Sequence, residues 1–464
     1  MGKTLIIVGA VYVILLILFS LVTRERAKST KNYFLAGSNL GSFLGLFTFA
    51  ATLFSTFTLL GMPDFFRVHG VGAWIFLAVS DAVMVFGILW LGHYLRKRTA
   101  HSNYMGMSGF LRQAYDSPWA GYVAFIGAFL FLIPYVAIQI RGVSIFLQAA
   151  FPGFVPVWVW AFAMVIIMLL YSEIGGLKAI IYNDMLQGLI LLIVIWVVAW
   201  ICLGKVGGIE QMFDSVAEKQ EALLSVPGPK GLFDFQFLLG SLIAICLIPF
   251  TQPQVSTRLV IMKDHRALAR TAVGLGTFAL LVIFPTLLIG MYGAIYYPEA
   301  TTADFLGQAL IKDQPGYLGA FVMIGLVAAA ISTADSQIFA LGGETRSLLE
   351  GEDRKMMGYA RISIVVFAGL ALIFALMTSD ELVLLARASF TGTALLAPMI
   401  FTAIFSDRSD QMRWLPFATL VSILILILSQ LKVIPATFLN IRVDLLLLVV
   451  LALVSIVGVR ARRR

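Results

Sequence analysis

The residues best suited to chemistry lie in one stretch, AAAISTADS at positions 328–336, which places a carboxylate and three hydroxyls within an apolar segment. At 3.6 residues per turn, Ser332, Thr333 and Ser336 share a helix face with Ala329, and Asp335 lies beside Ser332 at i+3. Such oxygens are ligands that alkali and alkaline-earth cations prefer to thiolates or imidazoles. A packing face of small residues would explain the alanines and hydroxyls but not the acid, because a carboxylate inside a bilayer is costly and usually functional. The stretch therefore predicts a cation site.

Further ionisable side chains fall inside apolar segments, where each is expected to face the protein interior or water and to have a partner. Asp184 lies about two turns into its segment, and it is either a functional carboxylate or a helix-start acid satisfied by backbone amides. Asp81 is either a proton or substrate site or the ion-pair partner of an arginine. The sequence does not decide between the two alternatives given for Asp184, nor between the two given for Asp81.

Two arginines share this setting. Arg141 is predicted near the middle of a long helix, where its guanidinium either neutralises a buried acid such as Asp81 or presents a planar fork to a substrate carboxylate. Arg387 lies nearer the outer end of its segment, where snorkelling, an outer-gate ion pair and substrate contact explain it equally well.

The elements that must position these residues are membrane spans. The chain has 464 residues, of which 60% are hydrophobic and 12% charged, and its mean hydropathy is +0.95. No soluble fold of this size is so apolar, so the composition predicts an all-α polytopic membrane protein. Segments of about 20 apolar residues can cross a bilayer core of ~30 Å, and we place thirteen of them, near 4–22, 40–61, 71–94, 118–149, 155–172, 180–204, 234–256, 271–297, 317–345, 358–378, 381–405, 414–431 and 438–459.

The distribution of basic residues predicts the orientation. Lysines and arginines gather in alternate connections, near 24–31, 96–112, 178, 258–270, 346–361 and 408–413, and in the tail 460–464. By the positive-inside rule the N-terminus lies outside and the C-terminus in the cytoplasm, in agreement with an odd number of spans. Because the +8 charge sits in short loops, we expect no nucleic-acid partner. Two cysteines and four scattered histidines give no disulfide framework, metal cluster or catalytic triad, so we expect no enzyme.

Two spans carry signals of interruption. Positions 48–58 read TFAATLFSTFT, and positions 248–254 read IPFTQPQ, with Pro249 and Pro253. Proline removes a backbone donor and clashes with the preceding turn, and broken backbone at membrane depth persists only where it lines a site. Broken spans in corresponding positions predict an inverted-repeat transporter with halves at 40–204 and 234–405.

Four motifs occur in the order found in a known family. They are NYFLAGS at 32–38, GGLKA at 175–179 continuing through Asp184 and Gln187, RLVIMKD at 258–264, and STADS at 332–336. Together they resemble the sodium:solute symporter family, which includes sodium-coupled proline, pantothenate, sialic acid and glucose transporters. The resemblance implies a LeuT-type fold of five plus five helices in a single transmembrane domain, with one extra helix at 4–22 and two at 414–459.

The resemblance also implies where sodium binds. The family's shared sodium site maps onto the carbonyls of Ala51, Phe54 and Ala329 and the hydroxyls of Ser332 and Thr333. A second sodium site, found in some members, maps onto Asp184, Ser332, Asp335 and Ser336. One or two sodium ions are therefore expected as the cofactor, although Asp335 could instead carry a proton or pair with a base.

The substrate positions implied by the resemblance are Ser55, Phe57, Thr58, Asp81, Gln139, Arg141 and Thr251. In the sialic acid transporters an arginine on the helix of Arg141 holds the substrate carboxylate. Phe57 and Thr58 stand where sugar transporters carry acidic and amide side chains. We therefore expect a small carboxylate-bearing solute, such as a monocarboxylate, an amino acid or an acidic sugar.

These expectations predict a sodium-coupled symporter of the cell membrane that imports its solute by alternating access. The alternatives are a membrane sensor built on the same fold and a proton-coupled symporter in which Asp335 or Asp184 titrates. We expect a small-molecule substrate and surrounding lipid as partners. A monomer is adequate for this function, and the sequence leaves the oligomeric state open.

Overall fold

The computed structural model describes residues 2–23, 30–100, 104–172, 176–349, 351, 353–407 and 409–461. The predicted connections at 24–29, Gly175, Arg408 and the tail 462–464 lie outside the described residues. The first part of the chain contains α1 (Gly2–Thr23), α2 (Thr30–Leu35), η1 (Ala36–Ser38), α3 (Ser42–Leu53), η2 (Phe57–Gly61), α4 (Met62–His69), η3 (Ile75–Val79), α5 (Ser80–Thr99), α6 (Met107–Ala114), α7 (Pro118–Ala150), α8 (Val157–Ser172), α9 (Gly176–Val206), α10 (Ile209–Gln220) and η4 (Glu221–Leu224).

The second part is also helical, apart from one short hairpin. It contains α11 (Phe235–Thr251), α12 (Pro253–Ile261), α13 (His265–Tyr296), α14 (Thr302–Gly307), η5 (Gln308–Lys312), α15 (Gly316–Leu348), α16 (Asp353–Met377), α17 (Leu382–Ala394), α18 (Ala397–Phe405), η6 (Ser409–Met412), α19 (Trp414–Gln430), β1 (Thr437–Phe438), β2 (Ile441–Arg442) and α20 (Val443–Ala461). The two strands pair antiparallel, with Thr437 opposite Arg442.

Among the described residues, eight helices are long and apolar enough to cross a membrane, and two bent helix pairs raise the number to ten. Three shorter apolar helices, Lys3–Phe19, Val157–Leu169 and Trp414–Gln430, coincide with further predicted spans. The all-α membrane class is therefore confirmed, whereas the count of thirteen spans stays a prediction.

Both predicted interruptions are present. Helices α3 and η2–α4 meet at an angle of 57°, and α11 and α12 also meet at 57°. At each break one residue has extended backbone: Phe54 has φ −98° and ψ 113°, and Gln252 has φ −101° and ψ 120°. Pro253 then occupies the first turn of α12, where its missing N–H leaves no helix bond unmade.

The two broken spans extend further than the sequence predicted. The first continues beyond 61 to His69, and the second continues beyond 256 to Ile261. The second difference matters, because it moves Arg258 from a predicted loop into the protein interior, where its side chain is 1% exposed. A count of apolar residues ends this span too early, because it stops at the charged Arg258. The ion pair with Asp184 makes that charge tolerable inside the bundle.

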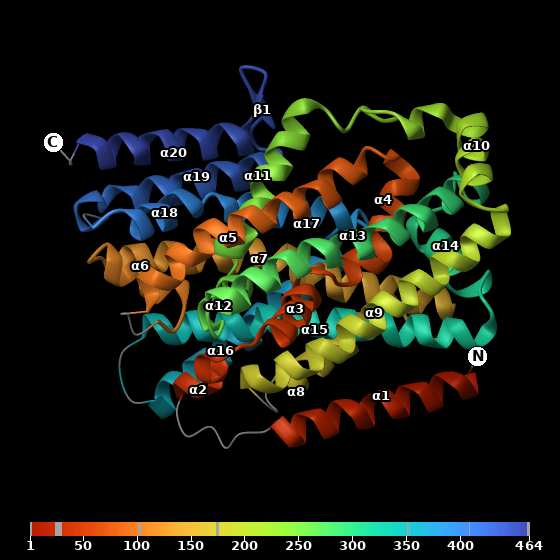
Figure 1. Cartoon of the computed structure of the whole chain (residues 1–464), viewed down its shortest axis with the longest axis horizontal. Coiled ribbons are helices and arrows are strands. Elements are labelled where there is room, and N and C mark those ends of the chain that lie inside the picture. Colours follow the sequence, from red (N-terminus) through yellow and green to blue (C-terminus); the bar gives the residue numbers. More distant parts are fainter. Residues whose placement is uncertain are drawn as a thin grey trace.

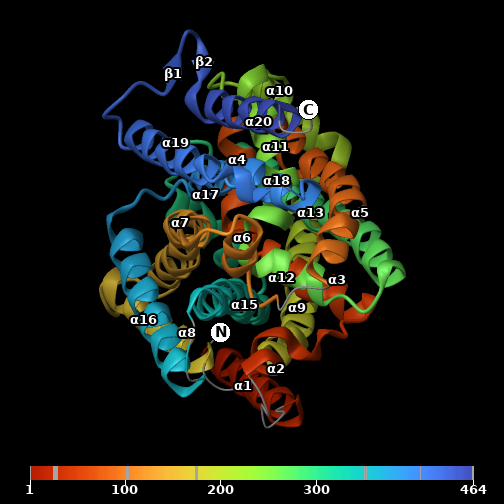
Figure 2. The ribbon, with the colours of Figure 1, turned by 90° about the vertical axis from the view of Figure 1, so that its left-hand side faces the viewer.

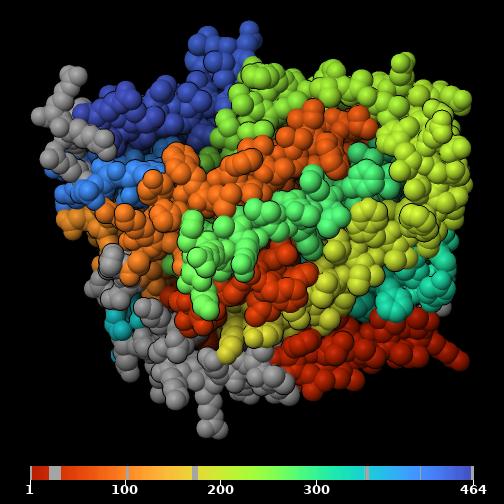
Figure 3. Space-filling model, viewed as in Figure 1, coloured from red at the N-terminus to blue at the C-terminus, as the bar shows by residue number. Residues whose placement is uncertain are grey.

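Helix α15, which carries the 328–336 stretch, lies at the centre of the bundle. Viewed end-on in Figure 2, it lies among α3, α6, α7, α9, α12 and α16; α1, which also packs against it, lies at one edge of the bundle and α20 at the opposite edge. The apolar window of α15 is 78% buried, compared with 17% for α20. On the face shown in Figure 3, α5, α13 and α9 pack side by side as oblique bands.

The start of α1 and the end of α20 lie at opposite ends of the bundle (Figure 1). Successive long helices run in opposite directions between these two ends of the bundle. Helix α7, for example, begins at the end where α20 finishes. This arrangement fits an odd number of crossings. The assignment of 40–204 and 234–405 as repeats, with 4–22 and 414–459 as additional helices, stays a prediction.

Candidate functional site

The carbonyl of Ala51 is the meeting point of the first break and the central helix. The hydroxyl of Ser332 donates to this carbonyl over 3.0 Å, and the hydroxyl of Thr333 donates over 2.8 Å. Ser332 Oγ also lies 3.2 Å from the carbonyl of Ala329. All four residues are at most 1% exposed, so the fold gathers four oxygens of two helices in one buried place.

Phe54, the fifth residue predicted for this site, lies at the break itself. Its backbone N–H donates to the carbonyl of Ala50 over 2.7 Å and closes the last turn of α3. Its ring packs on Phe278 of α13, with the ring centres 5.8 Å apart. The structure thus places Phe54 beside the cluster without giving its carbonyl a bond to the other four residues.

A second buried cluster surrounds Arg258. Its guanidinium donates to Asp184 Oδ2 over 3.1 Å, to Ser336 Oγ over 2.7 Å and to Thr48 Oγ1 over 2.8 Å. The hydroxyl of Thr48 donates in turn to Asp184 Oδ2 over 2.6 Å. The remaining guanidinium nitrogen donates to the carbonyl of Gln254. Helices α3, α9, α12 and α15 therefore meet at one ion pair.

Asp335 belongs to the same region but is not part of these bonds. It is 0% exposed, and neither carboxylate oxygen has a hydrogen-bond partner among the described residues. Asp184 Oδ1 is likewise without a partner there. An unpaired buried charge is strongly unfavourable, so oxygens like these are expected to bind a cation or a proton. With Asp184 and Asp335 ionised and Arg258 protonated, the cluster carries one net negative charge, which one monovalent cation would neutralise.

The sequence analysis missed two members of this cluster. Arg258 was assigned to a loop, although its place in the RLVIMKD motif and five residues after Pro253 was a signal that the helix continues. Thr48 begins the hydroxyl-rich run 48–58, but no partner could be named for it. Of the second predicted ion site, Asp184 and Ser336 are bound to Arg258, Asp335 is unpartnered, and Ser332 belongs to the Ala51 cluster.

Several predicted substrate residues gather just beyond the first break. Gln139 of α7 accepts a bond at Oε1 from the backbone N–H of Thr56 over 3.3 Å. The hydroxyls of Ser55 and Thr58 accept backbone N–H groups of this turn, over 3.2 Å from Phe57 and 3.1 Å from Ser55. These residues are buried, and their side chains satisfy the amides that the broken helix leaves unpaired.

Two aromatic side chains that the sequence did not single out, Tyr135 and Phe390, lie beside the first break. Tyr135 donates its hydroxyl to the carbonyl of Leu53 over 2.9 Å, and its ring meets Phe390 with centres 5.3 Å apart. Phe57 meets Phe390 from the other side at 6.4 Å. Tyr135 lies one helical turn before Gln139 on α7, which is the signal that could have identified it.

Asp81 lies near this group of residues, whereas Thr251 lies at the second break. Asp81 is half-buried in α5, within electrostatic range of Tyr135 and Cys246. No ion pair to Asp81 is formed within the described part of the chain, so the pairing with Arg141 that the sequence left open is not what the structure has. Thr251 lies at the second break, where its hydroxyl donates to the carbonyl of Leu247 over 3.0 Å.

Arg141 points away from the Gln139 cluster. Two residues along a helix correspond to a turn of about 200°, so the two side chains cannot share a face. Arg141 Nε donates instead to Asp380, in the connection between α16 and α17, over 2.7 Å. The two side chains are 21% and 37% exposed, so this pair is at the margin of the bundle rather than at its middle.

Arg387 forms an ion pair, one of the three alternatives that the sequence left open. It donates to Asp444 of α20 over 2.8 Å and to the hydroxyl of Ser241 over 2.8 Å, and its guanidinium lies 4.5 Å from the ring centre of Phe237. Arg442 lies 3.4 Å from the same carboxylate. This contact joins α17 and α11 to α20.

Comparison with known proteins identifies the family. The model of the sodium:solute symporter family matches residues 33–412, which is most of the chain. The chain belongs to the sodium:solute symporter family. It is therefore a multi-pass membrane transporter that couples the movement of a small solute to sodium, and not an enzyme. The resemblance carried by the four motifs is confirmed.

Relatives of this symporter are distant in sequence but align over most of its length. A sodium/pantothenate symporter of Haemophilus influenzae is 22% identical over 85% of this chain and 83% of its own. A sodium/proline symporter of Escherichia coli is 21% identical over 87% of this chain and 83% of its own.

Solved structures confirm the LeuT-type fold of this symporter. The structure of a sodium-coupled sialic acid symporter in a substrate-bound outward-open state covers 98% of this chain and 96% of that one, with a TM-score of 0.80 at 17% identity. The transporter MhsT in complex with L-phenylalanine covers 83% of this chain and 98% of that one, with a TM-score of 0.57 at 15% identity.

Proposed function

We propose that this symporter imports a small carboxylate-bearing solute together with sodium, by alternating access. The observation that supports the sodium site is the meeting of the Ser332 and Thr333 hydroxyls at the carbonyl of Ala51. The carbonyls of Ala51, Ala329 and Phe54 and the two hydroxyls supply only oxygen ligands, which suit a hard monovalent cation. An ion held there would tie α3 to α15 and order the neighbouring substrate residues.

A second sodium ion is proposed at Asp184, Ser336, Asp335 and Ser332. The unpartnered oxygens of Asp335 and Asp184 and the net negative charge of the Arg258 cluster support it. Since Arg258 already contacts Asp184 and Ser336, an ion at those two oxygens would have to share them with the guanidinium or displace it. A second ion would also change the driving force. One sodium and an anionic solute carry no net charge together, so the membrane potential would not drive their transport. With two sodium ions one net charge moves, and the potential contributes ~2.3 kcal/mol per 100 mV.

The first sodium site can be tested by thermal unfolding of the purified protein in sodium and in potassium. At a sodium concentration of 100 times its Kd, binding to the native state alone stabilises by about 2.7 kcal/mol. We expect the wild type to show a sodium-specific rise in Tm and Ser332→Ala to lose most of it. Ser422→Ala is the matched control, because its hydroxyl donates only to the carbonyl of Ala418 on the peripheral helix α19.

The outcome for Asp335 separates one bound ion from two. If Asp335→Asn keeps the full sodium effect, one ion is bound, at the Ala51 cluster. If sodium and potassium stabilise the wild type equally, the assignment of sodium to this cluster is contradicted.

The carboxylate on the solute is proposed from Arg141. Only its Nε is bonded to Asp380, and its other guanidinium nitrogens have no bonding partner among the described residues. Because the Arg141 side chain is partly exposed, its two terminal nitrogens can bind a carboxylate in the two-bond geometry that arginine favours. Asp380 then competes with the solute for the same cation.

This competition predicts opposite effects of two substitutions. With solutes found by a thermal-shift screen of small carboxylates and amino acids in sodium, we expect Arg141→Gln to raise the KM of uptake roughly tenfold or more, since a charged hydrogen bond contributes about 1.5–3 kcal/mol. Asp380→Asn is expected to lower KM. Equal KM values in all three proteins would contradict a role for Arg141 in solute binding.

Proton coupling is a second candidate, because Asp335 is a fully buried acid without a partner. Uptake into vesicles separates the two candidates. Uptake driven by a pH gradient without sodium, and abolished in Asp335→Asn, would favour protons. Uptake that requires sodium at every pH would exclude them.

A further inference from the structure

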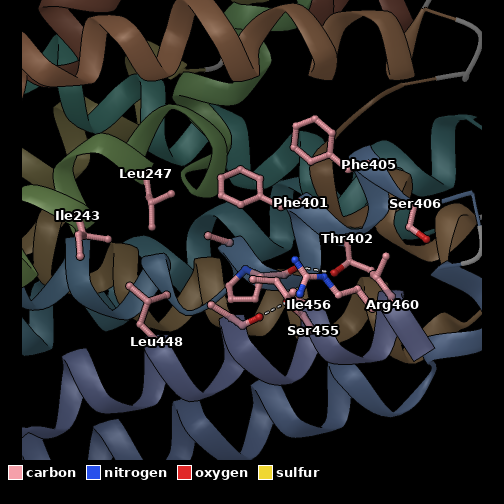
Figure 4. Close-up of a pocket in the computed structure, with 14 residues that line it drawn as sticks. Ile243, Leu247, Phe401, Thr402, Phe405, Ser406, Leu448, Ser455, Ile456 and Arg460 are labelled. Atoms are coloured by element: carbon pink, nitrogen blue, oxygen red, sulfur yellow. Dashed lines mark hydrogen bonds between the residues drawn. The ribbon is translucent and has the colours of Figure 1, made fainter. Parts of the chain in front are cut away.

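A cavity of about 450 Å³ lies outside the transport region, between α11, α18 and α20. Figure 4 shows Ile243, Leu247 and Leu448 at one end, Phe401 and Ile456 along its length, and Arg460 with Ser406 and Thr402 at the other end. Ile456 is 48% exposed and Phe405 is 42% exposed, and α20 is the least buried of the spans. The cavity is therefore an open groove on the outer surface of the bundle, facing the membrane.

The two ends of the groove differ in chemistry. Most of its lining is hydrocarbon, and two of its hydroxyls are bonded within their own helices: Ser455 donates to the carbonyl of Ala452 over 2.8 Å, and Thr402 donates to the carbonyl of Pro398 over 2.8 Å. At the other end the guanidinium of Arg460 is exposed and forms no ion pair with the described residues. No acid lines the groove, and Asp407 nearby is already paired with Arg98.

The length of the groove matches one leaflet. The helical rise of 1.5 Å per residue places Arg460 roughly 18 Å from Leu448 along α20. Half of a ~30 Å hydrocarbon core is about 15 Å. A chain that fills the groove from Leu448 would thus end at the headgroup level, beside Arg460. In sequence, Arg462, Arg463 and Arg464 follow directly and carry further positive charge.

We propose that this groove binds an anionic glycerophospholipid of the leaflet at which α20 ends. One acyl chain lies between Leu247, Phe401, Leu448 and Ile456, and the phosphate is paired with Arg460. Basic residues between or just beyond membrane helices bind anionic headgroups for this reason. A second copy of the chain is a poorer occupant, because two copies inserted in the same orientation would bring their Arg460 side chains to the same face.

The helices that form the groove also contact the second broken span and α17. Helix α11 leads into the second break, and α20 carries Asp444, the partner of Arg387 on α17. A lipid held between α11, α18 and α20 would therefore stabilise α20 against the transport bundle.

Native mass spectrometry of the full-length, delipidated protein in neutral detergent tests the proposal, with phosphatidylglycerol and phosphatidylcholine as probes. We expect phosphatidylglycerol to bind more tightly than phosphatidylcholine. We expect Arg460→Gln to weaken phosphatidylglycerol about fivefold, the equivalent of one basic residue near a charged surface, and to leave phosphatidylcholine unchanged. Ala452→Phe fills the groove and is expected to weaken both lipids.

Arg266→Gln is the matched control, because Arg266 is an exposed arginine in the first turn of α13, away from the groove; its lipid binding should equal that of the wild type. If Ala452→Phe does not yield monodisperse protein, Val459→Trp blocks the mouth of the groove at the depth where tryptophan is favoured.

Three results would overturn the proposal. The first is equal affinity of the wild type for the two lipids. The second is unchanged phosphatidylglycerol binding when the groove is filled. The third is a dimer that Ala452→Phe converts to monomers, which would assign the groove to a contact between copies. None of these depends on sodium or on the transported solute.

Discussion

At the scale of single residues, Arg258 is the buried cation that pairs with Asp184 in the interior of the bundle. It is 1% exposed and bonded to Asp184, Ser336, Thr48 and Gln254. Four bonds compensate for the cost of removing a guanidinium from water, and the single pair with Asp184 would not. The charges of Asp184 and Arg258 compensate each other, whereas Asp335 has no partner among the described residues, and this supports the proposed second cation site.

The Arg258–Asp184 pair gives a prediction about stability. We expect Arg258→Met alone to destabilise the protein by about 3–5 kcal/mol, because it leaves Asp184 buried without its partner. The double variant Arg258→Met with Asp184→Asn should recover much of this loss. Thermal unfolding of the two single variants and the double variant forms the cycle that measures the coupling.

The control for this cycle is Arg413→Gln, which removes one member of an exposed pair with Asp116 whose side chains are 60% and 78% exposed. Exposed pairs contribute little, so it should change stability by less than ~1 kcal/mol. A double variant that is less stable than either single variant would contradict the role of the pair.

At the scale of elements, the candidate site forms where two helices stop and restart at an angle of 57°. The extended residues Phe54 and Gln252 free backbone groups, and the neighbouring helices satisfy them: Gln139 binds the N–H of Thr56, and Tyr135 binds the carbonyl of Leu53. The two broken spans are also joined at their other ends, because Leu40, just before α3, forms backbone hydrogen bonds with Ile261 and Lys263 around the end of α12. The first break is therefore held by helix α7, and the start of α3 is tied to the end of α12.

Close approach of α7 to the first break requires a glycine. A Cβ at Gly142 would lie 2.2 Å from Cγ2 of Thr56, so Gly142→Ala must push α7 away from the broken segment. We expect this variant to lose sodium-dependent stabilisation and uptake while remaining folded in the membrane. Uptake and sodium-dependent Tm measure the effect.

Gly369→Ala on α16 is the matched control, because nothing lies within 4 Å of its Cβ position. It should behave as the wild type or be slightly more stable, since alanine favours helix over glycine by about 1 kcal/mol. Normal sodium response in Gly142→Ala would show that the distance between α7 and the break does not control the site.

At the scale of the whole molecule, the bundle is a central helix enclosed by a ring, with peripheral helices at two opposite edges (Figure 2). Helix α15 carries Ala329, Ser332, Thr333, Asp335 and Ser336, the residues proposed for the ion sites, whereas the apolar window of α20 is only 17% buried. Movement of α15 relative to α3 or α12 would change both ion clusters together, which is the coupling that symport requires.

The opposite positions of the two chain ends give a prediction about orientation. In a variant with Cys246 replaced by serine, we expect Lys3→Cys and Lys432→Cys to react with an impermeant maleimide applied from outside intact cells. Lys355→Cys should react only after the membrane is opened. All three positions are exposed, so accessibility reports the side of the membrane. Labelling of Lys355→Cys from outside would reverse the predicted topology.

The sequence by itself determined the membrane class, the positions of both breaks and the shared helix face of Ser332, Thr333 and Ser336. Hydrophobic length decides which segments leave water, and proline or crowded hydroxyls decide where a helix stops, so these features are local. Helical periodicity placed Ser332, Thr333 and Ser336 on one face. The four motifs then identified the family, because their order and spacing are carried by the chain itself.

Only the tertiary structure decided which charges meet. Asp184 and Arg258 are 74 residues apart, and Arg141 and Asp380 are 239 apart. Periodicity gives the direction of a side chain but not the helix that lies opposite, and that neighbour is set by the packing of the whole bundle. For the same reason the sequence placed Arg258 in a loop, could not name Asp380 as the partner of Arg141, and gave no sign of the groove beside α20.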